Sequence, residues 1–433
     1  MTDELRIRIL KGMADVPAAD WDACANPNAA RAGLSIASNL AGKSSELNKL
    51  DKLACEPPHD AYASISNIVY NPFISHAFLL ALEASGSATA KTGWMPQHLI
   101  AERDGKVVGV VPCYLKSHSR GEYVFDRGWA DAYERAGGSY YPKLQVSVPF
   151  TPATGPRLLV PPGHREDQLR AALAQGLVEV CQAHRASSVH ITFMPKPEWD
   201  LLAARGYLQR TDQQFHWENG GYDSFEAFLE KLSARKRKVI RRERRDAVAN
   251  GIEIVRLTGS DITEAAWDAF FAFYMETGSR KWGRPYLTRR FYSLIGQSMA
   301  DRVLLVMAKR AGRYIAGAIN FIGSNTLFGR HWGAIEHHPF LHFEVCYYQA
   351  IEYAITHGLK RVEAGAQGEH KLARGYLPQT TYSAHYIADP ALRRAIADYL
   401  VRERAYVEAA GEELGEMSPF RKNLAEEEEA ETI

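Results

Sequence analysis

The chain contains two copies of one pattern, and this duplication constrains its fold more than any single motif does. The two copies share six matches in the same order: Trp21–Ala23 with Trp267–Ala269, Pro72–Phe78 with Pro285–Phe291, Gly105 with Gly312, Phe125–Trp129 with Phe328–Trp332, Glu179–Val189 with Glu352–Val362, and Ala204–Leu208 with Ala373–Leu377. The last pair is the same pentapeptide, ARGYL, and a histidine and an aromatic residue follow each copy (His216-Trp217 and His385-Tyr386). Because the order is collinear, we expect two copies of one fold, with extra residues in the first copy.

Length and composition agree with this expectation. At 433 residues the chain is long enough for two or three domains, and the duplication favours two. It is 46% hydrophobic and 24% charged, which is typical of a soluble globular protein. Its 52 Lys+Arg and 51 Asp+Glu nearly cancel, so the net charge does not indicate a class of binding partner. The first ten residues, MTDELRIRIL, lack the apolar run of a signal peptide, and no apolar stretch is long enough to span a membrane. Five cysteines without C-x-x-C spacing indicate reduced thiols, so we expect a cytoplasmic protein.

Hydrophobic periodicity and turn signals predict the same order of elements, β-α-α-β-β-β-α-β-α-β, in both copies. In the first copy we expect strands at 5–10, 98–103, 106–115, 123–129, 189–193 and up to 217, with helices at about 17–24, 72–85, 166–184 and up to 205. In the second we expect strands at 252–257, 303–309, 313–321, 326–333, 361–364 and 381–387, with helices at about 263–276, 287–299, 341–357 and 369–374. Hairpins beside one crossover predict, in each copy, a mixed and mostly antiparallel sheet flanked by helices, an α/β fold.

The expected domain boundaries follow from the same pattern. Residues 1–220 form the N-terminal domain, with an insertion at about 27–65, and 251–390 form the C-terminal domain. Residues 221–250 are a basic connecting helix, 391–415 a C-terminal helix and 416–433 an acidic tail without fixed structure. The sequence does not set the oligomeric state.

Five longer motifs resemble those of a known family. They are NPFISHAFLLALE (71–83), PFTPATGPRLL (149–159), KWGRPYLTRRFY (281–292), GRHWGAIEHHPFLHFEVCYYQAIEYA (329–354) and EAGAQGEHKLARGYLP (363–378). With them, the chain resembles the FemAB-like predicted N-acyltransferases, which carry the label "peptidoglycan biosynthesis/recognition". The element order also resembles the Fem-type aminoacyltransferases, which are paired GNAT (N-acyltransferase) domains. The likeness covers nearly all of the chain except 27–65 and the acidic tail.

The resemblance implies two tandem GNAT-like domains and an acyltransferase that moves an acyl or aminoacyl group to an amine, with a cell-wall precursor as one candidate acceptor. It implies no permanently bound cofactor, and the acyl donor is either aminoacyl-tRNA or acyl-CoA. The loop with which CoA-dependent GNAT enzymes cradle pyrophosphate, Gln/Arg-x-x-Gly-x-Gly/Ala, follows neither central strand, which weakens CoA as donor. The alternative is a GNAT pair without catalysis that acts as an RNA-binding or precursor-binding module.

The chemistry is expected at the carboxyl ends of strands 326–333 and 361–364, where an open α/β sheet normally binds its ligand. Transfer to an amine needs a proton acceptor, and the candidates, in falling order, are Glu369, His370, Glu336 and His331. Segment Glu369–Lys371 matches Asp200–Leu202, and His331 matches Gly128, so the titratable cluster lacks a counterpart in the first copy. Arg330 and Trp332, by contrast, match Arg127 and Trp129 and are expected to be scaffold. We therefore expect the second copy to carry the chemistry.

The residues expected to bind substrate are Lys281, Trp282, Arg284, Tyr286, Trp332, Gln367 and Lys371. Structural roles remain open for several of these candidates: Glu369 is also a favourable carboxylate for a helix N-terminus, and 281–284 is also a turn with exposed charge. Four histidines (331, 337, 338 and 342) have a spacing that matches no standard zinc site, so no metal is expected.

A basic stretch separates the two copies. Residues 231–245 contain nine Lys or Arg and one Glu. Such a stretch can contact tRNA phosphates or a nucleotide-linked precursor, or it can be a solvated connecting helix. A peripheral membrane-surface role is a third alternative, without an integral membrane segment.

Overall fold

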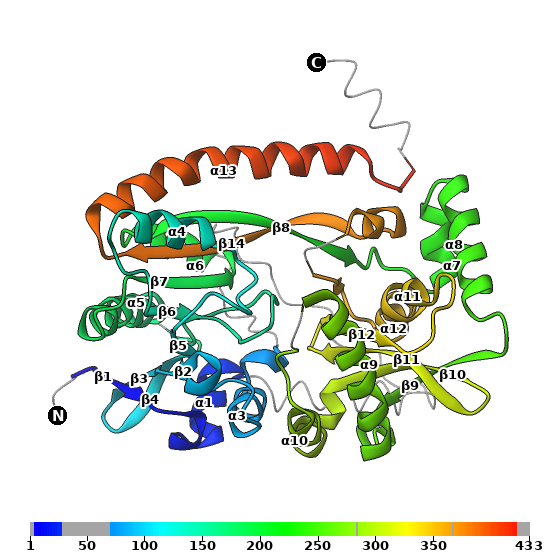
Figure 1. Ribbon diagram of the computed structural model, residues 1–433, viewed down its shortest axis with the longest axis horizontal. Coiled ribbons are helices and arrows are strands. Elements are labelled where there is room, and N and C mark those ends of the chain that lie inside the picture. Colours follow the sequence, from blue (N-terminus) through cyan, green and yellow to red (C-terminus); the bar gives the residue numbers. More distant parts are fainter. Residues whose placement is uncertain (1–3, 28–69, 164, 283–284, 366–367, 422–433) are drawn as a thin grey trace, which may run out of the picture.

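The computed structural model describes residues 4–27, 70–163, 165–282, 285–365 and 368–421. The expected insertion at 27–65 and the acidic tail lie almost entirely outside these residues. In Figure 1 the first copy occupies the left of the molecule and the second copy the right, and the long C-terminal helix lies along both.

The first copy begins with strand β1 (Arg6–Leu10) and helix α1 (Ala18–Ala25). After the short helix η2 (Pro72–Ile74) and helix α3 (His76–Ala84) come the strands β2 (Trp94–Pro96), β3 (His98–Arg103), β4 (Lys106–Val111) and β5 (Cys113–Lys116). It ends with α4 (Arg127–Arg135), β6 (Lys143–Val146), α5 (Glu166–Ala183), β7 (Ser188–Met194), α6 (Lys196–Ala203) and β8 (Leu208–Glu218). Except for 123–129, the predicted helices and strands of this copy are present, with shifts at their ends.

The basic connection is two helices, α7 (Phe225–Lys231) and α8 (Ala234–Ala247), rather than one. The second copy then contains β9 (Ile252–Thr258), α9 (Glu264–Trp282), α10 (Arg289–Met299), β10 (Val303–Arg310), β11 (Arg313–Ile322) and β12 (Thr326–Ala334). The expected helix at 341–357 consists of α11 (Leu341–Phe343), the π-helical turn η6 (Glu344–Tyr348) and α12 (Gln349–Thr356). Strand β13 (Arg361–Glu363), the 3₁₀ helix η7 (Glu369–Arg374), β14 (Leu377–Ile387) and α13 (Pro390–Glu416) complete the chain.

The two copies exchange their last strands. One eleven-stranded sheet has the order β2-β5-β6-β7-β14-β8-β13-β12-β11-β10-β9, and a three-stranded sheet has the order β1-β3-β4. Strand β8, from the first copy, is antiparallel to β13 of the second, and β14, from the second copy, is antiparallel to β7 of the first. Each copy therefore completes the sheet of the other, and β8 and β14 pair with each other in the middle. The α/β fold with a mixed, mostly antiparallel sheet flanked by helices is confirmed; the joining of the two copies in one sheet was not expected.

Around the parallel pairs the two halves have the same strand order, β5-β6-β7-β14 and β11-β12-β13-β8. Each half has one parallel pair, β6 with β7 and β12 with β13, and only these two pairs of neighbours run parallel in the described residues. The pairings Leu144↔Val189 and Leu327↔Val362 align the two halves, because Val189 and Val362 are matched in the repeat. The counterpart of β12 is therefore β6, which the sequence did not reveal.

This alignment corrects the predicted strand at 123–129. Residues 127–135 form helix α4, whose Trp129, Ala130 and Tyr133 pack in a cluster with Leu392 and Ile396 of α13. The match between Phe125–Trp129 and Phe328–Trp332 is therefore not a structural correspondence. Arg127 and Trp129 lie in α4, whereas Arg330 and Trp332 lie in β12, so the repeat gives no support to the inference that both are scaffold residues.

No helix in the described part of the chain combines the length and the apolar character that crossing a membrane requires.

Candidate functional site

The parallel strands β12 and β13 diverge at a point that the sequence placed correctly. Their pairing runs from Thr326↔Arg361 to Phe328↔Glu363 and then stops, although β12 continues to Ala334. Beyond this point β12 contains a bulge: Asn320 of β11 pairs with Gly329 and Ile319 with His331, so Arg330 is left between the two pairs. A bulge redirects the side chain of the extra residue. Here it places Arg330 at the opening between the strands.

A cavity of about 100 Å³ occupies this opening. β12 contributes Arg330, His331 and Trp332, and helix α11 with the π-helical turn η6 contributes His342, Cys346 and Tyr347. Ala364, immediately after β13, closes one side. π-Helical turns are rare and occur often at functional sites. The wall of the larger cavity contains a cation, two imidazoles and a phenol, from Arg330, His331, His342 and Tyr347.

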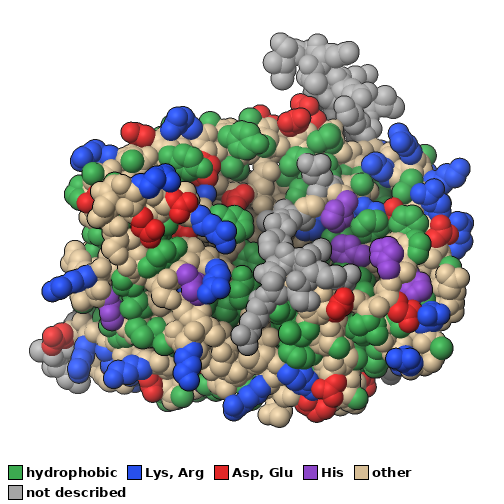
Figure 2. Space-filling model, viewed as in Figure 1, with side chains coloured by type: hydrophobic (Ala, Val, Ile, Leu, Met, Phe, Trp, Pro, Cys, Tyr) green, Lys and Arg blue, Asp and Glu red, His purple; other side chains and the backbone are tan. Residues whose placement is uncertain are grey.

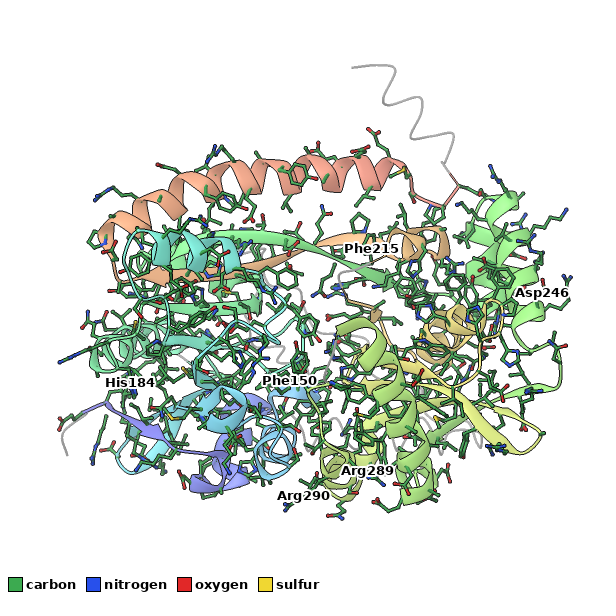
Figure 3. All side chains as sticks on the ribbon, viewed as in Figure 1. Phe150, His184, Phe215, Asp246, Arg289 and Arg290 are labelled. Atoms are coloured by element: carbon green, nitrogen blue, oxygen red, sulfur yellow. The ribbon has the colours of Figure 1, made fainter. Side chains whose placement is uncertain are left out.

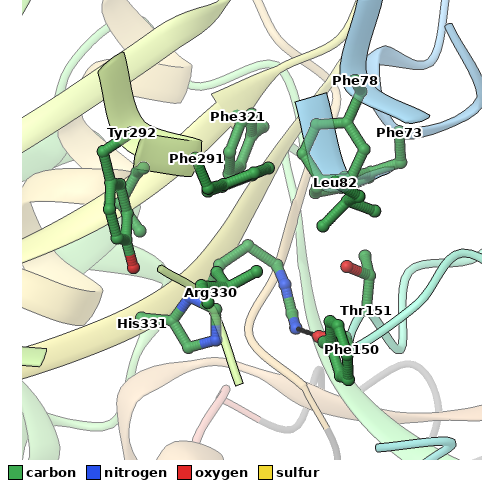
Figure 4. A pocket seen from close by; sticks show the side chains of 12 residues that line it. Phe73, Phe78, Leu82, Phe150, Thr151, Phe291, Tyr292, Phe321, Arg330 and His331 are labelled. Carbon is green, nitrogen blue, oxygen red and sulfur yellow. Dashed lines mark hydrogen bonds between the residues drawn. The ribbon is translucent and has the colours of Figure 1, made fainter. Parts of the chain in front are cut away.

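A second, smaller hollow lies on the first-copy side, with room for about one water molecule, about 10 Å³. It shares Ile319, Arg330 and His331 with the larger cavity, and aromatic and aliphatic side chains from both copies form the remainder (Figure 4). Arg330 points across this hollow, and its Nη2 donates a hydrogen bond of 2.5 Å to the carbonyl oxygen of Phe150. Burial lowers the pKa of Arg330. Arg330 was expected to be scaffold, and its place in the walls of both cavities makes it a functional candidate.

The loop that contains Phe150 lies between the two copies (Figure 3). Tyr286, an expected substrate-binding residue, stacks on Phe150 with ring centroids 4.7 Å apart and planes 10° apart. Arg157 is fully buried, and its guanidinium donates only to backbone carbonyls, those of Ala153, Gly155, Pro156 and Thr192. Burial lowers the pKa of Arg157 to about 10. This arginine stabilises the loop and, with it, the wall of the smaller cavity.

His370 lies beside the larger cavity. Its Nε2 is 3.0 Å from the hydroxyl oxygen of Tyr347, which is one of the cavity residues, and its ring is 6.1 Å from that of His342. The imidazole is exposed to solvent. Figure 2 shows histidines gathered on this part of the surface. Glu369 begins helix η7 next to His370, but its side chain lies outside the described residues, as does the whole of Gln367.

The other two predicted proton acceptors have less suitable surroundings. His331 lines both cavities, but burial and then the adjacent Arg330 cation lower its pKa to about 3. Its ring lies 4.9 Å from Tyr274 in an edge-on contact. Glu336 is not among the residues that line either cavity; it pairs with Arg310 at 2.8 Å and with His338 at 2.9 Å. The hydrogen bond from His338, and then Arg310, lower the pKa of Glu336.

The expected substrate-binding residues divide into three groups. Trp332 lines the larger cavity, with its ring 5.2 Å from that of His342, and Tyr286 stacks on Phe150 of the smaller one. Lys371 is buried, and its Nζ donates to the carbonyl oxygens of Ala364 at 2.6 Å and Gly365 at 3.1 Å. Burial lowers the pKa of Lys371 to about 8. The side chains of Lys281 and Trp282, at the end of α9, and the whole of Arg284 lie outside the described residues.

A buried carboxyl group at the same gap was not among the candidates. Glu363, the last paired residue of β13, is 5% exposed, and the backbone N–H of Thr154 donates to its Oε2 at 3.3 Å. Burial raises the pKa of Glu363 to about 7, against the opposing effects of that hydrogen bond and of Arg361 and Arg157. The sequence signal was weak, because a single glutamate at the end of the short, charged strand RVE looks like an exposed strand end.

The described residues contain no group of three or more His, Cys, Asp or Glu placed to hold a metal ion. In particular, His338 bonds to Glu336, while His342 packs against Trp332. The expectation of no metal stays a prediction.

Comparisons with known proteins identify the family. A family described as FemAB-like, peptidoglycan biosynthesis/recognition, matches residues 53–422. No curated protein sequence matches the chain. Among solved structures, the crystal structure of FemX is 13% identical, with a TM-score of 0.48, and the match covers 73% of this chain and 93% of that one.

Two further solved structures are similar. A tandem GNAT protein from the clavulanic acid biosynthesis pathway is 13% identical, with a TM-score of 0.41 over 89% of this chain and 99% of that one. The L-PGS of Bacillus licheniformis is 9% identical, with a TM-score of 0.45 over 68% of this chain and 86% of that one. Because the family match spans most of the sequence, the chain belongs to the FemAB-like family, and the expected class, acyl- or aminoacyl-transferring enzymes, is confirmed.

Proposed function

We propose that this protein transfers an acyl or aminoacyl group to an amine, with a peptidoglycan precursor as acceptor, in the gap between β12 and β13. The observation that carries this proposal is the cavity at the bulge, where Arg330, His331 and Tyr347 meet at the carboxyl end of a parallel strand pair. Ligands of open α/β sheets bind at such places. The FemAB-like family provides the precursor class.

The transfer is a direct displacement. The amine nitrogen attacks the carbonyl carbon, the new C–N bond forms, and the bond from carbon to the donor's oxygen or sulfur breaks. The amine must lose a proton, and the leaving group must gain one. Of the four predicted acceptors, His370 has the most suitable place, because Tyr347 connects it to the cavity wall. Arg330 provides a fork of N–H donors for a carboxylate or phosphate of the substrate.

Aminoacyl-tRNA and acyl-CoA both remain candidate donors, and the surface of α8 favours the former. Lys231, Arg235, Lys238 and Arg242 are exposed on α7 and α8. Helix α8 is anchored to the cavity region, because Arg244 pairs with Glu344 of η6 at 2.9 Å and Glu243 pairs with Arg374 of η7 at 2.8 Å. A polyanion on this helix would be next to the elements that form the cavity.

The test is a transfer assay with purified full-length protein. The donors are radiolabelled acetyl-CoA and a mixture of charged tRNAs, and the acceptor is a UDP-linked muramoyl pentapeptide. We expect label on the peptide amine with one donor class only. Mass spectrometry of small molecules that copurify with the protein identifies the donor independently. Absence of transfer from both donor classes, with no donor copurifying, would contradict the proposal.

The exposed cations of α8 also favour a second candidate, a binding module without catalysis. RNA binding through phosphates weakens linearly as the logarithm of salt concentration rises. If tRNA binds with a steep salt dependence and no donor is ever consumed, the binding module is the correct function. If liposomes bind the protein only when they contain anionic lipid, the membrane-surface alternative gains support.

A further inference from the structure

The exchanged strands bring a histidine of one copy opposite the residue at the strand gap of the other. His216 of β8 is the direct antiparallel partner of Glu363 of β13, and His385 of β14 is the direct partner of His190 of β7. Directly opposite residues of antiparallel strands point to the same face. The histidine that follows the pentapeptide ARGYL in each copy, His216 or His385, is therefore paired with the equivalent position of the other copy.

The two equivalent places have different contents. In the first half, Nδ1 of His190 and Nδ1 of His385 are 2.7 Å apart, and Ser188 and Tyr140 also contact His190, although Nε2 of His385 has no partner among the described residues. In the second half a carboxyl group replaces His190. Nδ1 of His216 and Oγ1 of Thr154 are buried there without a partner among the described residues.

Buried polar atoms in native proteins nearly always have a hydrogen-bond partner, and exceptions call for an explanation such as a ligand or a bound water. Here Thr154 and His216 both neighbour Glu363: the N–H of Thr154 donates to the carboxyl group, and His216 is its cross-strand partner. The three residues come from the loop of the first copy, the exchanged strand and β13. Together they form a polar group with unused hydrogen-bonding capacity.

This group lies next to the gap, although Glu363, Thr154 and His216 are not themselves among the residues that line either cavity. Glu363 ends the parallel ladder opposite Phe328; the next residue on each strand, Ala364 and Gly329, lines the larger cavity. A Cβ on Gly329 would lie 3.4 Å from the backbone oxygen of Glu363, so the strands are still close at this level. Arg330 is near enough for the charge of Glu363 to affect it.

We propose that Glu363 is the proton acceptor for the amine substrate, that His216 positions it, and that the amine enters from the side of Thr154. This inference rests on the proposed acyl transfer and names the residue that drives it. The carboxylate takes the proton that the amine loses as its C–N bond forms. The resulting carboxylic acid returns that proton to the oxygen or sulfur of the departing donor.

Charged groups around Glu363 shift its pKa in both directions. Arg361 on its own strand and Arg157 on the loop of the first copy favour the carboxylate, whereas Glu218 of β8 opposes it. Burial and the cations Arg361 and Lys371 lower the pKa of His216 to about 3, so this ring is neutral near pH 7. A carboxyl group with a pKa of about 7 is half ionised there, which suits a general base.

The experiment measures kcat/KM for the donor and acceptor pair that the wild-type protein uses, from pH 5.5 to 8.5. We expect the wild-type value to rise through about pH 7, because the carboxylate is the active form. Glu363→Gln should reduce kcat/KM at pH 8 at least a hundredfold and remove the rise. Glu102→Gln, at the pair with Arg8 and outside both cavities, is the matched control and should keep both the rate and the rise. His370→Ala tests the other candidate acceptor, and loss of the rise in this variant would contradict the proposal. His216→Asn should shift the pH at the midpoint of the rise in kcat/KM.

Folding of the variants is checked by melting temperature. Gln keeps the size of Glu and can still accept the N–H of Thr154, so Glu363→Gln should fold. The pKa of Glu363 is higher in the folded protein than in the unfolded chain, so folding favours the protonated carboxyl group. The stability that the protonated group contributes is therefore complete below about pH 4.5 and is lost as the pH rises through about 7. The melting temperature of Glu363→Gln relative to wild type should therefore increase between pH 5 and pH 8.

The outcomes separate two failures. If Glu363→Gln keeps a pH-dependent rate within tenfold of wild type, Glu363 is not the proton acceptor, and the proposed transfer stands. If His370→Ala loses the rise and Glu363→Gln does not, His370 has that role. If the wild-type protein transfers nothing, the proposed function fails, and this inference fails with it.

Discussion

Arg330 and Phe150 connect the two copies at the candidate site: Nη2 of Arg330, on the bulge of β12, donates to the carbonyl oxygen of Phe150 at 2.5 Å. The ring of Tyr123, also from the first copy, lies 5.8 Å from the same guanidinium. Among the side chains that the structure describes, no carboxylate is within ion-pair distance of Arg330. A partly buried guanidinium with only neutral partners can still bind an anion, and the cavities on both sides give an anion access.

Replacing Arg330 should therefore impair transfer much more than folding. We expect Arg330→Gln to lower kcat/KM about tenfold to hundredfold, which is about 1.4–3 kcal/mol, the usual range for a hydrogen bond to a charged group. Arg330→Lys should recover little, because a single ammonium cannot reproduce the fork. Steady-state kinetics check both variants.

The matched control for Arg330 is Arg310→Gln, on strand β10, which β11 separates from β12. Arg310 pairs with Glu336 and is not among the residues that line either cavity. Equal losses in the Arg310 and Arg330 variants would show that the effect is a general loss of positive charge and not recognition at the gap.

The fold of each copy was largely predictable from sequence, because strands such as 303–309 and 313–321 have clear periodicity and glycine turns. Two features were not. Residues 125–129 match 328–332 by chance, and Arg127 and Trp129 are equally compatible with helix α4, which packs against α13. The exchange of β8 and β14 depends on contacts between strands far apart in sequence, which periodicity does not report.

The candidate site was predicted in position but only partly in composition. The gap at the ends of 326–333 and 361–364 follows from general rules for open sheets. Arg330 was assigned to the scaffold because of the false match, and Glu363 was missed because its burial comes from the loop of the other copy. Residues His370 and Trp332, in contrast, lie within the motifs of their own copy and were named as candidates.

Glu243 should be important for stability because it joins three elements at the candidate site. Its carboxylate accepts two hydrogen bonds of 2.8 Å from Arg374 and one from the hydroxyl of Tyr348, and the side chains of the ion pair are each 7% exposed. Glu243→Ala leaves a buried guanidinium without its partner, which usually costs about 3–5 kcal/mol. Urea unfolding, followed by tryptophan fluorescence, should show this loss.

The exposed pair of Arg241 with Glu226 is the control for Glu243, because its side chains are 53% and 54% exposed. Glu226→Ala should have a much smaller effect, since solvent screens such pairs. A similar loss in both variants would mean that α8 is held by its overall charge rather than by the buried pair.

Cys346 should be the most reactive of the four described cysteines. It is partly exposed in the wall of the larger cavity, whereas Cys24, Cys113 and Cys181 are buried. Burial raises the pKa of Cys24 to about 12 and that of Cys181 to about 11, so thiolate is scarce at both. Brief treatment with iodoacetamide at pH 8, followed by peptide mass spectrometry, should find Cys346 labelled at least tenfold faster than these three.

The same labelling experiment, repeated with an acyl donor present, tests whether the donor occupies the larger cavity. A donor that enters the larger cavity should protect Cys346, whereas the same donor should leave the rates at the buried cysteines unchanged. Faster labelling of Cys113 or Cys181 than of Cys346 would contradict the described packing of the sheet core.

The strand exchange predicts that neither copy folds alone. A fragment of residues 1–222 lacks β14, so β7 becomes an exposed edge, and β8 loses both of its neighbours, β13 and β14. Long unpaired strand edges promote aggregation. We therefore expect this fragment to be insoluble or to show no cooperative melting transition, whereas coexpression with residues 223–433 should restore a soluble complex with a single transition. Because β14 also needs β7, the fragment 223–433 should behave in the same way; a soluble, cooperatively melting 1–222 fragment would show that the first copy completes its own sheet.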